Sequence, residues 1–267
     1  MFNNEEKLLE IRFNVLNKFV DHFVIIESKE THSGNKKNTT FEINKYPEFK
    51  EKIIYKKINS FPVSLNSWQK ENYQRNYISN CLNQAKEDDI VLISDLDEIP
   101  NLENVNFGNY NEKIIVFNQR LFFYKLNFGA KISSWHGTRA CQKKFLKSPQ
   151  WLRNLKTHKR YKFYRLDKLL FSKNYERNFK IINNGGWHFT WLGDLDFIKN
   201  KLKSFAHTEL NNSIVNNDNY IKKCIDELKP IEIKQKIELN KLSINEINLP
   251  TYVVQNIDKY RSLLDVN

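Results

Sequence analysis

The sequence IVLISDLDEIP, residues 90–100, constrains the fold more than any other stretch of the chain. Its four apolar residues predict a buried β-strand, and the carboxylates of Asp95, Asp97 and Glu98 follow almost at once. Carboxylates this close repel one another and each resists losing water, so a positive group should compensate them. We therefore expect a strand that opens into a charged site. The alternative is an acidic turn or a helix cap.

The segments before this strand predict an α/β fold. Strands alternate with helices along the chain, which implies right-handed crossovers and a mostly parallel central sheet flanked by helices. The predicted segments are strands over 22–28, 51–58 and 88–94, a helix over 5–20, and a helix from Asn66, where Asn66 and Gln69 suit a capping box.

No repeat or low-complexity linker divides the chain, so we expect a single domain. Residues 1–130 would carry the charged site and 131–210 a second half that is basic and aromatic. Residues 211–267 would form a helical C-terminal extension. Asp194 and Asp218 are each placed to cap a helix.

The composition excludes several classes of protein. The formal net charge is +12, but no helix-turn-helix, zinc-finger or RNA-binding signature accompanies it, so we expect no nucleic-acid partner. The remaining explanations are a solvated lysine-rich surface, an anionic membrane or a phosphate-bearing substrate. No apolar run has the roughly 20 residues of a membrane span. Three scattered cysteines and an N-terminal stretch unlike a signal peptide indicate a reducing, cytoplasmic setting.

Two chemistries use an Asp-x-Asp pair at a strand end. In both, Asp95 and Asp97 would approach one hard cation such as Mn²⁺ or Mg²⁺, because alternate strand residues share a face. In phosphatases of the haloacid dehalogenase type, Asp95 would be the nucleophile, but Glu98 and Ile99 follow where Thr or Val is usual. In nucleotide-sugar glycosyltransferases, the ion neutralises the donor diphosphate. The second chemistry fits better, and a non-catalytic glycan- or nucleic-acid-binding module is a third hypothesis.

Glycine is scarce in this chain, and a cluster of glycines marks a second candidate region. Three of the seven glycines bracket GGWHFTWLGD, residues 185–194, which predicts a close approach of backbone segments. His188 lies within it and is either a metal ligand or a core histidine. The flanking Trp187 and Trp191 either stack on a sugar ring or pack in the core.

The remaining candidates are charged side chains. An inverting transfer needs a base to deprotonate the acceptor hydroxyl, and Glu98, Asp194 and Glu209 are the candidates. Spacing does not choose among them. Arg75 suits recognition of a diphosphate, or else it pairs with Glu71 on the surface of the helix.

Six segments in order resemble glycosyltransferase family 17: FNNEEKLLEIRFNVL, VDHFVIIES, WQKENYQRN, DIVLISDLDEIP, GGWHFTWLG and KLKSFAHTE. The resemblance covers about residues 4–210, and LPTYVVQNIDKY near the end also fits it. It implies a GT-A type nucleotide-sugar-binding fold, a UDP-sugar donor, a divalent metal and inversion of configuration. N-acetylglucosamine is the sugar that it favours.

The resemblance also assigns individual residues. Asp95 and Asp97 stand at the Asp-x-Asp of the family and imply a metal site with His188 or His207 as a further ligand. Glu27 stands at the end of the first nucleotide-facing strand. The positions that match the family are Glu27, Arg75, Asp95, Asp97, Trp187, His188, His207 and Glu209.

The departures from the family concern location and partners. The eukaryotic members carry an N-terminal membrane anchor, which we expect to be absent here. An apolar strand that precedes the FNN segment in the family is also expected to be missing, with part of the uracil pocket. We therefore expect an enzyme at the cytoplasmic face of a membrane, acting on a glycan or lipid-linked glycan. The basic charge suits peripheral contact with anionic lipids.

Overall fold

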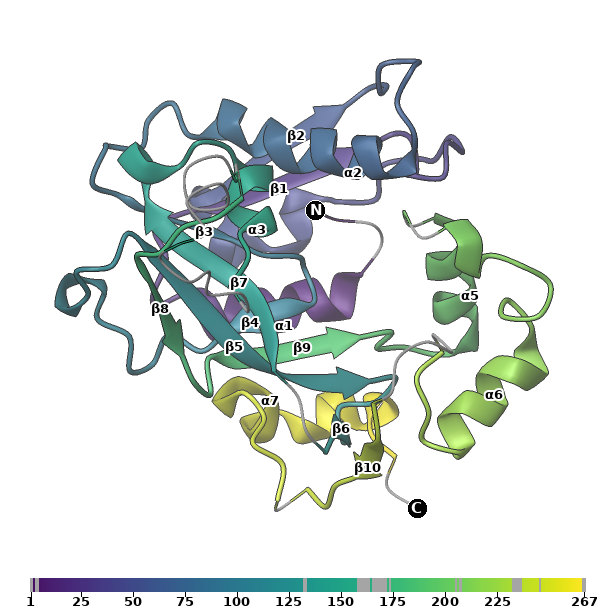
Figure 1. Cartoon of the computed structure of the whole chain (residues 1–267). Coiled ribbons are helices and arrows are strands. Elements are labelled where there is room, and N and C mark those ends of the chain that lie inside the picture. The colour runs from purple at the N-terminus through teal and green to yellow at the C-terminus, as the bar shows by residue number, and fades with distance from the viewer. Residues whose placement is uncertain are drawn as a thin grey trace.

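Two β-sheets form the framework of the protein, and helices surround them (Figure 1). The computed structural model describes residues 2, 5–131, 134–157, 164, 172, 174–204, 206, 208–231, 237–244 and 246–265. The strands are β1 (Phe23–Ser28), β2 (Ile53–Ile58), β3 (Ile90–Ile93), β4 (Glu98–Pro100), β5 (Ile114–Phe123), β6 (Phe128–Ala130), β7 (Trp135–Gln142), β8 (Phe179–Ile182), β9 (Gly186–Thr190) and β10 (Leu239–Lys241). The α-helices are α1 (Glu6–Leu16), α2 (Ser67–Asn76), α3 (Pro149–Asn154), α5 (Leu195–Ser204), α6 (Asp218–Asp226) and α7 (Thr251–Gln255). None of the described helices is long and apolar enough to cross a bilayer.

The larger sheet is mixed, so the prediction of a mostly parallel central sheet is wrong. β5 lies at its centre and pairs in parallel with β8 and β9 but antiparallel with β6 and β7. The register of β5 against β7 shifts between Val116 and Asn118. On either side of this irregularity, the first half of β5 lies beside β8 and the second half beside β9. The irregularity lets one long strand serve two parts of a curled sheet.

The predicted parallel pairing holds for the first two strands only. β1 and β2 pair in parallel and form a separate two-stranded sheet. β3, which was expected to extend that sheet, pairs antiparallel with β7 instead. β7 occupies one edge of β3, and none of the described strands pairs with its other edge. β7 comes from the basic, aromatic middle of the chain, where no clear periodicity indicated a strand.

An apolar groove of about 660 Å³ is lined by residues of both β1 and β3. α1 lies against this groove through Leu9, Phe13 and Leu16, three of its buried residues. Among the described strands, β1 pairs with β2 alone and β3 with β7 alone. Beside the groove, Phe13 of α1 and Phe23 of β1 share one buried cluster, and Ile90 and Leu92 of β3 pack against it, so side-chain packing joins the two sheets.

The helix predictions hold in type but not at every boundary. α1 ends at Leu16, four residues earlier than predicted. The capping box at the start of α2 is confirmed, because Asn66 and Gln69 each accept a hydrogen bond from the other's backbone N–H at 2.9 Å. α2 ends at Asn76 and continues as a 3-10 helix over Tyr77–Cys81.

The C-terminal extension packs onto the body of the protein. Asn217, and not the predicted Asp218, caps α6 with its side chain, while Asp218 pairs with Lys199 of α5 at 2.6 Å. Further on, the hydroxyl of Tyr260 donates to Glu10 of α1 at 3.0 Å. The last part of the chain thus braces both α5 and α1, which both contribute to the site described next.

Candidate active site

The loop after β3 carries Asp95 and Asp97, Glu98 follows at the start of β4, and one arginine of α1 holds this segment in place. Arg12 of α1 donates to the backbone oxygens of Asp95 at 3.2 Å and Glu98 at 2.7 Å, and to the hydroxyl of Ser94 at 2.5 Å. Burial lowers the pKa of Arg12 to about 10, although the neighbouring carboxylates oppose this shift. Arg12 was not a sequence candidate. Because Arg12 donates to the backbone oxygens of both Asp95 and Glu98, it stabilises the turn between β3 and β4.

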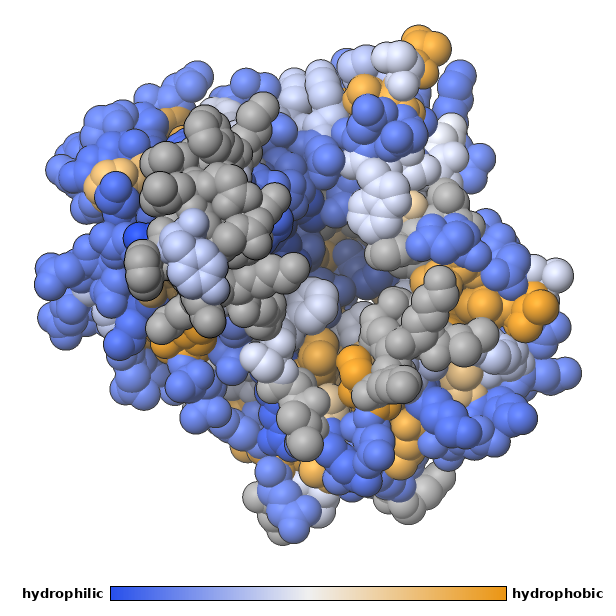
Figure 2. Space-filling model, in the orientation of Figure 1, coloured by the Kyte–Doolittle hydropathy of each residue, from blue (hydrophilic) through white to orange (hydrophobic). Residues whose placement is uncertain are grey.

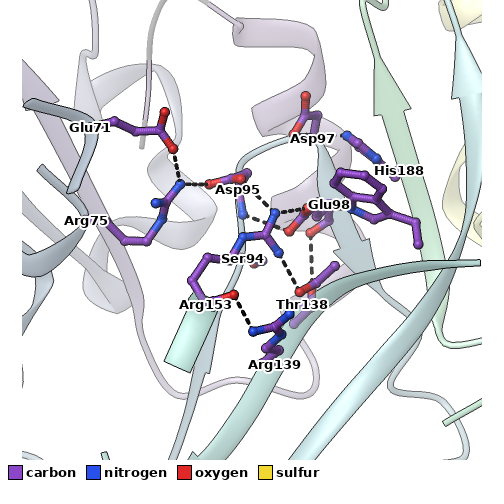
Figure 3. Close-up of polar contacts among 12 residues, drawn as sticks. Glu71, Arg75, Ser94, Asp95, Asp97, Glu98, Thr138, Arg139, Arg153 and His188 are labelled. Atoms are coloured by element: carbon purple, nitrogen blue, oxygen red, sulfur yellow. Dashed lines mark hydrogen bonds and ion pairs between the residues drawn. The ribbon is translucent and has the colours of Figure 1, made fainter. Parts of the chain in front are cut away.

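Asp95 is held by two arginines from different helices (Figure 3). Arg75 of α2 lies 2.9 Å from Asp95 Oδ1, and Arg153 of α3 lies 3.0 Å from Asp95 Oδ2. Arg75 also pairs with Glu71 at 2.7 Å, which confirms the predicted helix pair. Burial alone would raise the pKa of Asp95, but the two guanidinium groups outweigh it and hold this pKa well below its usual range.

Asp97 points to a different set of partners. Its Oδ2 lies 3.1 Å from Nζ of Lys201 on α5, and its Oδ1 lies 3.7 Å from Nε2 of His188 on β9. Lys201 also pairs with Glu5 at 2.9 Å. β3 ends at Ile93, so both aspartates lie in the loop, and the expected alternation of strand side chains does not govern them. Figure 3 shows their side chains diverging from the loop.

Glu98 lies at the start of β4 and is fully buried. One of its oxygens accepts from Arg153 and from Nε1 of Trp135, the latter at 2.7 Å. The other accepts from the backbone N–H of Asp95 at 3.1 Å. The ring of Trp135 also lies 4.8 Å from that of His188. Glu98 therefore connects the Asp-x-Asp loop to β7 and α3, and both of its oxygens have partners.

The close approach predicted for the glycine-rich stretch is confirmed at Gly186. This residue has φ of +126°, and a Cβ there would lie 2.1 Å from the backbone oxygen of Ile99. β4 and β9 pair antiparallel at this point, with Glu98 opposite His188. The glycine thus lets β9 approach β4 closely enough to place His188 beside the carboxylate loop.

A pocket of about 190 Å³ opens beside these side chains. Both aspartates of the pair line it, and Figure 2 shows the surface hollowed between α2 and α5. Both carboxylates and cationic side chains line it, so the pocket presents charges of both signs to a ligand. The lining residues that matter here are Glu5, His32, Lys37, Glu71, Arg75, Asp95, Asp97, Lys201 and Ala206.

Two predicted cofactor-binding residues lie inside the protein. Glu27 is fully buried at the end of β1, where it accepts hydrogen bonds from Tyr55 at 2.7 Å and Lys37 at 3.1 Å and from two backbone N–H groups. Trp187 is 5% exposed and donates from Nε1 to the backbone oxygen of Asn248 at 2.5 Å. Of the two alternatives for Trp187, core packing is the one observed.

The remaining predicted residues lie around the pocket or outside the described structure. Asp194 is exposed and caps α5 by accepting from the N–H of Phe197 at 2.8 Å. Glu209 is exposed on a 3-10 helix that follows Ala206 of the pocket lining. His207 lies outside the described residues. In the part of the chain that is described, no group of three or more His, Cys, Asp or Glu side chains is arranged for a metal ion.

The family comparison decides the class of the protein. A sequence model of glycosyltransferase family 17 matches residues 1–267. The chain belongs to glycosyltransferase family 17. Over 120 residues, this family-17 protein is 31% identical to the human β-1,4-mannosyl-glycoprotein 4-β-N-acetylglucosaminyltransferase. The match covers 39% of this chain and 22% of the human protein. The rat and mouse proteins of the same name are 31% and 30% identical over 120 residues.

The family-17 chain spans only about a fifth of the length of these relatives, from 21% to 22%. No solved structure matches it significantly. Membership of a glycosyltransferase family confirms the resemblance and the enzyme class predicted from the sequence.

Proposed function

We propose that this family-17 protein transfers a sugar from a UDP-sugar to a glycan acceptor, with inversion at the anomeric carbon. N-acetylglucosamine is the first sugar to test, because the named relatives are N-acetylglucosaminyltransferases. The observation that carries the proposal is one pocket lined by Asp95 and Asp97 together with Arg75 and Lys201. Cations beside a carboxylate pair suit a diphosphate and its divalent counterion. We assign β1–β3 and their loops the nucleotide-binding role, as in a GT-A type fold.

Mn²⁺ or Mg²⁺ is the proposed cofactor, with Asp97 and His188 as ligands. The 3.7 Å between Asp97 Oδ1 and His188 Nε2 fits two ligands of one ion, which lie about 3–4 Å apart at usual bond lengths. His188 Nδ1 is buried without a hydrogen-bond partner among the described residues. Asp95 suits the ion less well, because both of its oxygens contact arginines. When bound, the ion offsets the negative charge on the departing UDP, and His207 is a further candidate ligand.

The cationic side chains have the role of orienting the diphosphate. Arg75 is only 4% exposed, and its pairs with Asp95 and Glu71 fix the direction of its guanidinium group. A planar guanidinium held in this way is preorganised for phosphate oxygens. Lys201 adds a second positive charge on the opposite wall of the pocket, on α5. We assign to Asp95 the positioning of Arg75 and Arg153.

Glu209 is the proposed base for the acceptor hydroxyl. Among the three candidates, Glu98 has partners at both oxygens, and Asp194 holds the N-terminus of α5. Glu209 is exposed and lies three residues after Ala206 of the pocket lining, where an acceptor could approach. The exposure of Glu209 and its place beside the pocket lining support the choice.

Neither rival function gains an observation in its favour. A phosphatase of the haloacid dehalogenase type needs a free oxygen of Asp95 as nucleophile, and both oxygens lie about 3 Å from arginine nitrogens, at 2.9 and 3.0 Å. A binding module without catalysis predicts no dependence on a divalent ion.

The three free cysteines suit the reducing, cytoplasmic setting that we propose, with a glycan or lipid-linked glycan as acceptor.

The function is tested by incubating the whole chain with a panel of UDP-sugars and Mn²⁺ and measuring UDP release. We expect hydrolysis or transfer with at least one donor, fastest with UDP-N-acetylglucosamine, and loss of this activity on chelation of the metal. Absence of UDP release with every donor, or release unaffected by chelation, would count against the proposal. Hydrolysis of a generic phosphomonoester would instead favour the phosphatase.

A further inference from the structure

The loop that links β2 to α2 is uncharged and has an apolar tip, and lysines of β2 and α2 flank it. Residues 52–70 contain four lysines and no aspartate or glutamate, whereas Glu51 and Glu71 flank the segment. The tip of the loop reads FPVSL, residues 61–65. Apolar residues flanked by lysines are typical of surfaces that bind anionic lipid.

One large apolar residue of the tip is fully exposed, and two aromatic residues of α2 are partly exposed. Val63 is 103% exposed, the highest value among the exposed large hydrophobic residues of the described chain. Trp68 at the start of α2 is 46% exposed, and Tyr73 on the same helix is 37% exposed. Figure 2 shows apolar side chains projecting from the upper right of this face, where the loop between β2 and α2 lies in Figure 1. Tryptophan and tyrosine favour the boundary between membrane and water.

The tip is firmly anchored and therefore holds its shape. Phe61 at its base is 5% exposed, and its N–H donates to Glu30 at 3.3 Å. The ring of Tyr73 packs edge-on against Phe61 at 6.0 Å, and Nζ of Lys70 lies 5.9 Å from the Phe61 ring. The protein thus presents Val63 to solvent from a packed base, which leaves its apolar surface available to a partner.

The tip also adjoins the candidate active site. Glu30, which accepts from Phe61, lines the pocket with His32 of the same loop. His32 in turn contacts Gln74 of α2 at 2.7 Å, and Lys70 of α2 lies against Gly34. A surface on which this tip rests would therefore lie beside the pocket.

We propose that the apolar tip, together with Lys56 and Lys57 at the end of β2, forms a docking surface for an anionic lipid bilayer. Val63 and Trp68 enter the interface, and the exposed Lys56 and Lys57 supply positive charge for the acidic headgroups. This proposal rests on the proposed function in one respect: docking here brings the pocket to a lipid-linked acceptor. The binding itself requires no donor, metal or acceptor.

The test is co-sedimentation of the whole chain with lipid vesicles in the absence of UDP-sugar and metal. Vesicles of phosphatidylcholine alone are compared with vesicles containing about 30% phosphatidylglycerol, at low and high salt. We expect binding to the anionic vesicles only, and weaker binding at high salt. The variants Val63→Glu and Trp68→Ser should each bind about tenfold less tightly, because both lose apolar contact with the bilayer.

Two other exposed apolar residues supply the matched controls. Ile214 is 67% exposed and Ile244 is 47% exposed, and both lie outside the 52–70 segment. Ile214→Glu and Ile244→Glu should bind vesicles as the native chain does. No binding by the native chain, or equal losses in the controls and in Val63→Glu, would overturn the proposal. Release of UDP without vesicles should be unchanged in Val63→Glu, so failure of docking is distinguishable from failure of the proposed function.

Discussion

Asparagine in place of Asp97 is expected to slow sugar transfer by about a hundred- to a thousandfold while the protein stays folded. The substitution keeps the shape of the side chain but removes the charge that faces Lys201 and His188. Burial alone would raise the pKa of Asp97, but Lys201 and His188 outweigh it and keep the pKa low, so the native side chain is ionised at neutral pH. Initial rates of UDP release with Mn²⁺, together with the thermal unfolding midpoint, measure both parts of the prediction.

Asp194→Asn is the matched control for this experiment. Asp194 is exposed and caps α5, and asparagine caps helices about as well as aspartate. The control should therefore keep both its stability and its rate of transfer. A fully active Asp97→Asn variant would refute the role given to Asp97. A large loss in Asp194→Asn would show that the wrong carboxylate had been assigned as base.

Removal of the Glu98 carboxylate should destabilise the protein by about 3–5 kcal/mol, the usual cost of breaking a buried ion pair. Glu98→Ala leaves Arg153 and the indole N–H of Trp135 without this acceptor and removes the brace of the Asp95 backbone. Arg153 retains its contact with Asp95, so the effect should lie toward the lower end of the range. Urea denaturation of both proteins gives the difference in the free energy of unfolding.

An exposed ion pair supplies the comparison. Glu238 pairs with Lys131 at 2.7 Å at the surface, where solvent screens the charges, so Glu238→Ala should leave stability unchanged. Glu98→Gln should recover part of the loss, because its amide oxygen still accepts one hydrogen bond. If Glu98→Ala is as stable as the native protein, the buried network does not hold the loop as described.

The early part of the fold could be predicted because its signals are local. β1, β2 and the start of α2 follow from apolar periodicity and from the Asn66 and Gln69 side chains, which act within a few residues. The sheet order could not be predicted in the same way. The pairing of β3 with β7 joins residues as far apart as Ile90 and Gln142, and periodicity within a segment carries no information about its partner.

The candidate site, too, could be predicted only in part. Asp95, Asp97, Arg75 and His188 were found because a dense carboxylate motif, a helix pair and a glycine-rich turn marked them in the sequence. Arg153 was missed, because its short helix lies in the basic, aromatic middle of the chain and no pattern tied it to Asp95.

Other residues were missed or misjudged because long-range packing sets their role. Arg12 lies on α1 some 80 residues before the loop it holds, so nothing local distinguished it from a surface arginine. Trp135 was likewise unmarked. Glu27 was expected to face the nucleotide, but the fold surrounds its oxygens with donors from the 37–41 segment and β2.

The central claim is that Asp97 and His188 hold a divalent ion against the diphosphate of the donor. Calorimetric titration of UDP into the whole chain, with and without Mn²⁺, tests this claim most directly. We expect UDP to bind at least about tenfold more tightly with Mn²⁺ in the native protein. This gain should disappear in Asp97→Asn and shrink in His188→Ala. Equal affinity for UDP with and without the metal, or a gain that survives in Asp97→Asn, would contradict the account.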